Sequence, residues 1–222
     1  MYLVNALAFE AQWEKVYDEF QVQEGYFTTE DETRQDVEMM HSEEHYYLED
    51  ELATGFIKYY EGRKYAFVAL LPNEGVSVSQ YVENLTGEHL AKLLSNQKDV
   101  TVFATMPKFE TEYDIEMSEV LQEMGMTDAF DYRVADFSRL GTYNVDGMNI
   151  CISRVLHKTF ISVAEQGTRA GAATAVEMPA YGAMEIPEFK EVVLDRPFVY
   201  MIIDCETNLP FFMGTMMDVN GG

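Results

Sequence analysis

A stretch of mostly small residues, Glu165 to Val176, most constrains what this chain can fold into. Its sequence is EQGTRAGAATAV, and it lies between two strongly apolar, strand-like runs. A permanently buried strand would carry Val, Ile, Tyr or Phe here. A linker would carry Gly and Ser with no preferred face. The segment fits neither type, so it needs another explanation.

The segment has two different faces when its residues are taken alternately, as side chains alternate in a strand. The two charged residues nearby, Arg169 and Glu177, fall on one face. The opposite face carries no charge and consists of Thr168, Ala170, Ala172, Thr174, Val176 and Met178. Small side chains can enter a packed sheet while charges stay in water. The pattern therefore predicts a conditional strand: a loop that can become part of a sheet.

The same segment carries a family resemblance. Glu165-Gln166-Gly167-Thr168, followed by the Ala/Gly/Thr run, resembles the hinge of the reactive-centre loop of serpins. Other motifs resemble serpin strands and occur in the family's order along the whole chain. They are Leu3-Val4-Asn5-Ala6 with Trp13, Phe67 to Pro72, Met106-Pro107-Lys108-Phe109, Arg196 to Asp204, and Leu209 to Gly214. Each motif alone is weak, but their order makes the resemblance specific.

The resemblance implies an α+β fold, the serpin fold with several sheets and short helices. Residues 1–222 would be one serpin domain, with the reactive-centre loop at about 165–190. A serpin normally has a long helical region and two further sheet strands before the motif at Leu3. We therefore interpret the chain as the C-terminal portion of a longer protein or as a truncated gene product. A complete protein of this family is expected to be a monomer and extracellular.

The resemblance also implies a function, suicide-substrate inhibition of serine proteases. Counted from hinge residue Glu165, the bait bond would be Tyr181–Gly182, and an aromatic residue there favours a chymotrypsin-like target; a cysteine protease is a second option. Met178 and Met184 are alternative contact residues. The hinge that enters the sheet after cleavage would comprise Glu165, Gly167, Thr168, Ala170, Ala172, Ala173 and Thr174.

Two further groups match family positions that control loop insertion. Asn5 and His157 match the shutter, a buried hydrogen-bond cluster beneath the strands that must separate. Trp13, Lys108 and Glu165 match the breach, where the loop first enters the sheet, and Lys108 would pair with Glu165. A lone His in a strand is usually a satisfied core residue, so a structural role for His157 stays open.

Composition excludes several other classes of function. The net charge of −24 argues against binding nucleic acid or an anionic membrane through a basic surface. With 47% hydrophobic and 13% aromatic residues the chain is globular. No apolar run is long enough to span a membrane. Cys151 and Cys205 are too few for a disulfide scaffold and are expected to be buried free thiols.

We expect no enzyme activity, metal or cofactor. Phosphate-loop, Gly-x-Ser-x-Gly and His-Glu-x-x-His motifs are absent from the sequence. His41 and His45 could hold a metal from one helical face, but the surrounding pattern is strand and turn, which favours surface histidines. A hydrolase using His157 lacks an identifiable nucleophile. The main alternative to inhibition is a non-inhibitory, serpin-like binding or structural protein, or an inactive fragment.

The local patterns predict many strands and few helices. Strands are expected at Tyr2 to Phe9, which should be buried, at Val100 to Glu112, at Ile150 to Ala164, and in three runs after Val192. Gly55 to Leu71 predicts a hairpin. Short helices are expected at Ser77 to Asn84, at Thr86 to Leu94, and at Ser118 to Met124, the last stopped by Gly125.

Overall fold

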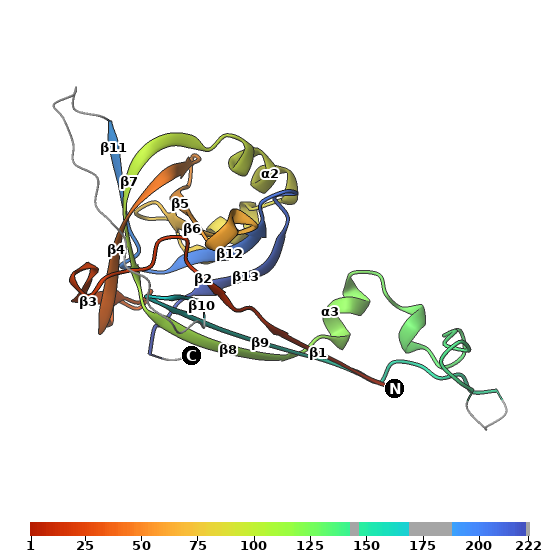
Figure 1. The fold of residues 1–222 in the computed structure, drawn as a ribbon. Coiled ribbons are helices and arrows are strands. Elements are labelled where there is room, and N and C mark those ends of the chain that lie inside the picture. The colour runs from red at the N-terminus through yellow and green to blue at the C-terminus, as the bar shows by residue number, and fades with distance from the viewer. Residues whose placement is uncertain (143–146, 169–187, 221–222) are drawn as a thin grey trace. The chain divides into compact units, whose positions relative to one another are not determined.

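The structure is a computed structural model that describes residues 1–142, 147–168 and 188–220 (Figure 1). The chain divides into two compact units. The first consists of Met1–Phe9 and Thr111–Ile161, and the second of Glu10–Glu110 and Ser162–Gly222. The expectation that the whole chain forms one domain stays a prediction, and each unit is described by itself.

The second unit is built on an eight-stranded sheet with the order β11-β7-β4-β5-β6-β12-β13, in which β3 also pairs with β4. Most neighbouring strands are antiparallel, while β11 and β7 are parallel. The strands are β3 (Val22–Thr28), β4 (Arg34–Glu49), β5 (Ala53–Tyr59), β6 (Tyr65–Pro72), β7 (Lys98–Pro107), β11 (Phe189–Val193), β12 (Phe198–Asp204) and β13 (Pro210–Met216).

The predicted hairpin is confirmed as β5 and β6, which pair in antiparallel register from Ala53↔Pro72 to Tyr59↔Ala66. The connection contains η2 (Glu61–Arg63), in which Gly62 has a φ of +75°. That backbone conformation costs glycine little, because glycine has no Cβ. The run of apolar residues in β6 is buried along almost its full length, as expected for a central strand.

Two predicted helices cover part of this sheet. α1 (Val78–Asn84) and α2 (Gly87–Ser95) begin after Ser77 and Thr86, whose side chains accept hydrogen bonds from the backbone of the first turn. Their apolar residues join the sheet in a core of Leu48, Ala53, Ile57, Ala66, Val68, Leu70, Val78, Tyr81, Leu90, Leu93, Leu94, Val199, Met201 and Ile203. This core joins α1 and α2 to strands β4, β5, β6 and β12.

The second unit also holds the short strands β2 (Ala11–Gln12) and β10 (Gly167–Thr168), and η1 (Glu19–Gln21). β10 pairs with β2 and with the last residues of β9 (Arg154–Ala164). These strands continue a second, five-stranded sheet with the order β1-β9-β10-β2, in which β8 (Phe109–Glu116) also pairs with β9. The strand predicted at Val100 to Glu112 is therefore two strands, β7 and β8.

In the first unit, β1 (Tyr2–Ala8) pairs in parallel with β9, from Tyr2↔Arg154 to Ala8↔Phe160. The unit also contains α3 (Ser118–Glu123), which ends before Gly125 as predicted, and η3 (Asp128–Phe130). The strand at Tyr2 was expected to be buried, and this is wrong for the described structure. Tyr2 is 67% and Val4 70% exposed, and β9 is the one strand that pairs with β1 within the described residues.

Three sequence expectations about sites can be placed in this fold. His41 and His45 lie in β4 and not on a helix. No group of three or more His, Cys, Asp and Glu side chains among the described residues could hold a metal ion. Cys151 and Cys205 are free and half-buried, so their full burial was not correct. None of the described helices has both the length and the apolar character needed to cross a membrane.

Candidate hinge site

The start of the small-residue segment lies inside a sheet. β10 runs antiparallel to both of its neighbours, with Gly167 opposite Ala164 and Gln12, and Thr168 opposite Val163 and Ala11. Of the predicted hinge, Glu165, Gly167 and Thr168 therefore belong to the described residues. The others, Ala170, Ala172, Ala173 and Thr174, lie outside them, as do Met178, Met184 and the predicted reactive residues Tyr181 and Gly182.

Gly167 occupies a position that admits no side chain. A Cβ there would lie 2.2 Å from the Ala11 carbonyl oxygen and 2.7 Å from the Gln12 Cα. Its φ is +146°, a conformation that residues with a side chain rarely adopt. Both facts follow from the close approach of β10 to β2. Only glycine lets the chain enter the sheet at this point.

Thr168 is completely buried, which is unusual for a polar residue at the start of a loop. Its hydroxyl shares a hydrogen bond of 2.7 Å with the hydroxyl of Tyr60, which is also buried. Burial raises the pKa of Tyr60 well above its ordinary value, so this phenol stays neutral and can donate or accept. The hydrogen bond compensates the loss of water around both hydroxyls.

Trp13 and Tyr17 hold the backbone just before β10. The Trp13 amide donates to the Gln166 carbonyl at 3.0 Å, and the Tyr17 amide donates to the Glu165 carbonyl at 3.0 Å. The indole Nε1 of Trp13 donates to the Ala164 carbonyl at 2.8 Å. Trp13 is 1% exposed and its ring stacks on Tyr60, with 4.4 Å between the ring centroids. Trp13 thus contacts the residues that lead into β10, and its role in the breach stays a prediction.

Lys108 and Glu165, predicted to pair, are 2.7 Å apart, and Lys108 also lies 2.8 Å from Glu38. Burial raises the pKa of Glu165, but the hydrogen bond from Lys108, a backbone hydrogen bond and the charge of Lys108 together outweigh burial, so the pKa is lowered overall. The side chains of Lys108 and Glu165 are 26% and 31% exposed, so water screens the pair. We expect it to contribute less than about 1 kcal/mol.

Gln166 was not singled out from the sequence. Its Oε1 is buried and has no hydrogen-bond partner among the described residues. A buried acceptor without a donor destabilises the arrangement that contains it. Backbone hydrogen bonds therefore stabilise the hinge in this position, and the buried Gln166 Oε1 destabilises it. Sequence alone gives no signal for this, because it depends on what surrounds the amide.

The predicted shutter residues lie in the first unit. Asn5 in β1 and His157 in β9 are register partners, so the structure brings them side by side. Asn5 is exposed and His157 half-buried in the described structure, which differs from the buried cluster expected. The difference follows from the open face of β1. The roles of Asn5 and His157 in loop insertion stay predictions.

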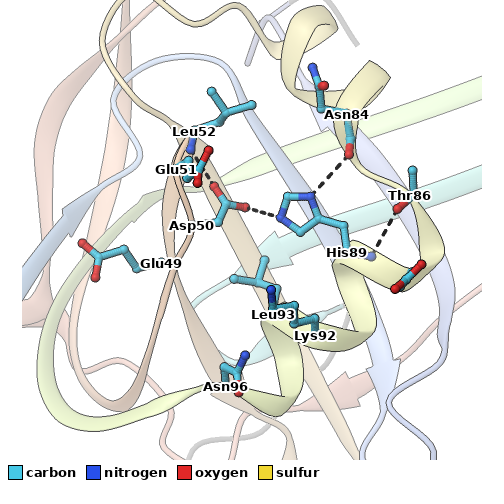
Figure 2. A pocket seen from close by; sticks show the side chains of 11 residues that line it. Glu49, Asp50, Glu51, Leu52, Asn84, Thr86, His89, Lys92, Leu93 and Asn96 are labelled. Atoms are coloured by element: carbon cyan, nitrogen blue, oxygen red, sulfur yellow. Dashed lines mark hydrogen bonds and ion pairs between the residues drawn. The ribbon is translucent and has the colours of Figure 1, made fainter.

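A separate cavity of about 590 Å³ lies between the β4–β5 turn and α2 (Figure 2). His89 in α2 points to Asp50, with His89 Nε2 3.0 Å from Asp50 Oδ2, while His89 Nδ1 lies 3.3 Å from the Asn84 carbonyl oxygen. Tyr81 also donates to Asp50. Both ring nitrogens of His89 are therefore engaged. The pair joins α2 to the turn.

Comparisons with known proteins relate the chain to one family. The family model "Serpin (serine protease inhibitor)" matches residues 1–219. A serpin-like protein of Thermococcus kodakarensis is 34% identical and is matched over 99% of this chain but 50% of its own length. The native-state crystal structure of tengpin, a thermophilic serpin, is 51% identical with a TM-score of 0.88, covering 98% of this chain and 55% of tengpin.

The latent-state structure of tengpin is less similar, with a TM-score of 0.76, 46% identity, and coverage of 95% of this chain and 55% of that one. The chain spans about half the length of the curated relatives it matches. The expected fold class, mixed sheets with few short helices, is confirmed by these structures.

Proposed function

Because the chain belongs to the serpin family, whose members are generally protease inhibitors and not enzymes, we propose that it acts as a suicide-substrate inhibitor of a serine protease. The bait bond would be Tyr181–Gly182, and the aromatic Tyr181 favours a chymotrypsin-like protease. The observation that carries the proposal is β10. The first residues after the hinge Glu165 already pair between two strands, in a place that only small side chains can occupy.

The first step would be attack on the loop by the protease. The serine hydroxyl oxygen attacks the carbonyl carbon of Tyr181, the bond to Gly182 breaks, and the proton from the hydroxyl goes to the new amino terminus of Gly182. The protease is then joined to Tyr181 as an ester. The hinge is freed at one end and can extend β10.

The register supports a specific path for this extension. Thr168 lies opposite Val163 of β9, and the two strands are antiparallel. If the same register continued, Thr174 would come opposite His157, where Asn5 now pairs. The insertion must therefore separate β1 from β9. A new central strand gains main-chain hydrogen bonds on both edges, which supplies the driving force. The uncharged face from Thr168 to Thr174 meets this demand, since buried charges are costly.

A mixing experiment tests the proposal. The full chain is incubated with chymotrypsin, and the products are separated on a denaturing gel. We expect a covalent complex for the natural sequence. Thr168→Arg places a charge at a fully buried position, so this variant should be cleaved at the same bond without forming the complex. The matched control, Thr168→Ser, keeps the hydroxyl and should still form it.

The second candidate is a chain without inhibitory activity, a binding or structural relative or an inactive fragment. One observation favours it: the apolar residues Tyr2 and Val4 of β1 are exposed. In the mixing experiment this candidate predicts clean cleavage with full protease activity remaining. It also predicts that Thr168→Arg changes nothing in the products.

A further inference from the structure

A buried charge lies beneath the segment that holds the hinge. Lys58 in β5 has a side chain that is 2% exposed, and its Nζ lies 2.8 Å from Oε1 of Glu44 in β4, a carboxylate that is 9% exposed. Removing such a pair from water is costly, and it is retained only where good geometry compensates the loss. The atoms around the pair show what it holds in place.

The ammonium of Lys58 is bound to the segment from Trp13 to Tyr17. It donates to the Lys15 carbonyl at 3.2 Å, and it lies 4.4 Å from the centre of the Tyr17 ring and 5.4 Å from that of Trp13. Cations are attracted to aromatic faces at these distances, most strongly where water is excluded. Lys58 thus contacts the segment at its two aromatic residues and at the backbone between them.

Glu44 completes this arrangement. Besides Lys58, it accepts a hydrogen bond of 2.7 Å from the hydroxyl of Ser42, and the Tyr17 hydroxyl lies 3.3 Å from the same Ser42 oxygen. Burial lowers the pKa of Lys58, but Tyr17 and Glu44 outweigh this, so the pKa is raised and the ammonium stays charged at neutral pH. The network therefore holds a charged ammonium against the segment from Trp13 to Tyr17.

The opposite side of that segment faces the hinge. The same residues, Trp13 and Tyr17, donate their amides to the carbonyls of Gln166 and Glu165. The segment therefore lies between the buried ammonium and the residues that lead into β10. A displacement of the segment on the Lys58 side removes the donors on the hinge side, because both contacts are made by the same short stretch.

We propose that Lys58, paired with Glu44, is a positioning residue for the hinge: it fixes the Trp13–Tyr17 segment and so sets how firmly the start of β10 is held. The expected effect of Lys58 on loop insertion rests on the proposed function, since β10 would be the first part of an inserting strand. If the Trp13–Tyr17 segment is held less firmly, insertion of the loop should be slower relative to release of the cleaved chain. The proportion of cleaved, unproductive inhibitor would then rise.

The test is amide hydrogen exchange on the full chain, with Lys58→Met as the main variant. We expect the amides of Trp13 and Tyr17 to exchange at least about tenfold faster, while that of Ile202 in β12 is unchanged. Lys58→Arg keeps the charge and should restore most of the protection. The matched control is Arg63→Met, which removes an exposed ion pair of 2.7 Å with Glu14 in the same segment. It should change exchange by less than about twofold.

Unchanged exchange at Trp13 and Tyr17 in Lys58→Met would overturn the proposal, and so would an equal increase at Ile202, because that is a loss of general stability. If Lys58→Met does not fold, Glu44→Gln decides the matter. It keeps an acceptor beside Lys58 and should raise exchange at the two amides by about threefold; no change there also overturns the proposal.

The protease assay separates this inference from the proposed function. If the natural chain forms a covalent complex, Lys58→Met should consume at least about twice as many inhibitor molecules per trapped protease as the natural chain. If the natural chain forms no complex but the exchange pattern holds, inhibition fails and the positioning role stands. If the complex forms and the exchange pattern does not hold, inhibition stands and the positioning role of Lys58 fails.

Discussion

Strands β6 and β10 both lie between two neighbours in a sheet, but they are built from opposite kinds of side chain. β6 lies between β5 and β12 and fills the core with large apolar groups such as Phe67 and Leu70. β10 lies between β9 and β2 and consists of Gly167 and Thr168. The first is held by buried volume and the second by close backbone approach and one hydroxyl. Under the proposed function, this is the difference between a permanent strand and a strand that the loop extends.

The largest effect is expected from Phe67→Ala in β6. Phe67 is fully buried and packs against Trp13 and Tyr200, with ring centroids 5.9 Å and 6.1 Å away. We expect the free energy of unfolding to fall by about 3–5 kcal/mol, measured by urea denaturation. Phe67→Leu, which retains most of the volume, should cost less than about 2 kcal/mol. Equal effects of both variants would contradict a strand held by volume.

The next effect is Gly167→Ala in β10, where the new Cβ would meet the Ala11 carbonyl oxygen. We expect a loss on the order of 2 kcal/mol, with faster exchange of the Thr168 amide. Gly75→Ala is a suitable control, because Gly75 has a φ of +85° but a Cβ added there would meet no atom within 4 Å. The control should show the cost of the backbone conformation alone. A loss at Gly167 no larger than at Gly75 would show that β10 is not tightly enclosed.

A smaller effect is expected from Thr168→Val, which keeps the shape of the side chain but removes the hydrogen bond to Tyr60. The loss should be about 1 kcal/mol in thermal unfolding. Thr168→Ser retains the hydroxyl, so it should recover the hydrogen bond and lose only a methyl contact. If Val is tolerated better than Ser, packing rather than the hydroxyl holds β10.

The smallest effect is expected from Glu165→Gln, which removes the ion pair with Lys108. The loss should be below about 1 kcal/mol at pH 7. The pKa of Glu165 is lowered in the folded chain from an ordinary value of 4.5. Its contribution is therefore present above pH 4.5 and is lost as the pH falls through the folded-state pKa. Thermal unfolding at several pH values should show the two proteins converging in acid, and a gap that widens in acid would contradict this.

Local patterns predicted much of the second unit. The hairpin of β5 and β6 and the helices after Ser77 and Thr86 depend on turn residues, caps and short-range periodicity, which a sequence displays directly. The pairing of Lys108 with Glu165 and the assignment of Trp13 to the breach came from the family resemblance. These contacts join residues far apart in the chain, so no local pattern could have indicated them.

Other features depend on surroundings that the sequence does not specify. Lys58 and Glu44 lie on two strands, and the sequence does not show that the pair is buried or that the rings of Trp13 and Tyr17 lie over the Lys58 ammonium. The apolar residues of β1 predicted burial, but Tyr2 and Val4 have only β9 as a neighbouring strand in the described residues, and both are exposed. The composition of a strand indicates whether it is suited to burial. Whether it is buried depends on what packs against it.

In the proposed function, β10 is the beginning of a strand that the rest of the loop extends. Thermal unfolding of the full chain before and after a single cut at Tyr181–Gly182 tests this. We expect the midpoint to rise by at least about 10 °C on cutting, as several kcal/mol of added strand pairing would produce in a chain of this size. A midpoint that is unchanged or lower after the cut would contradict it.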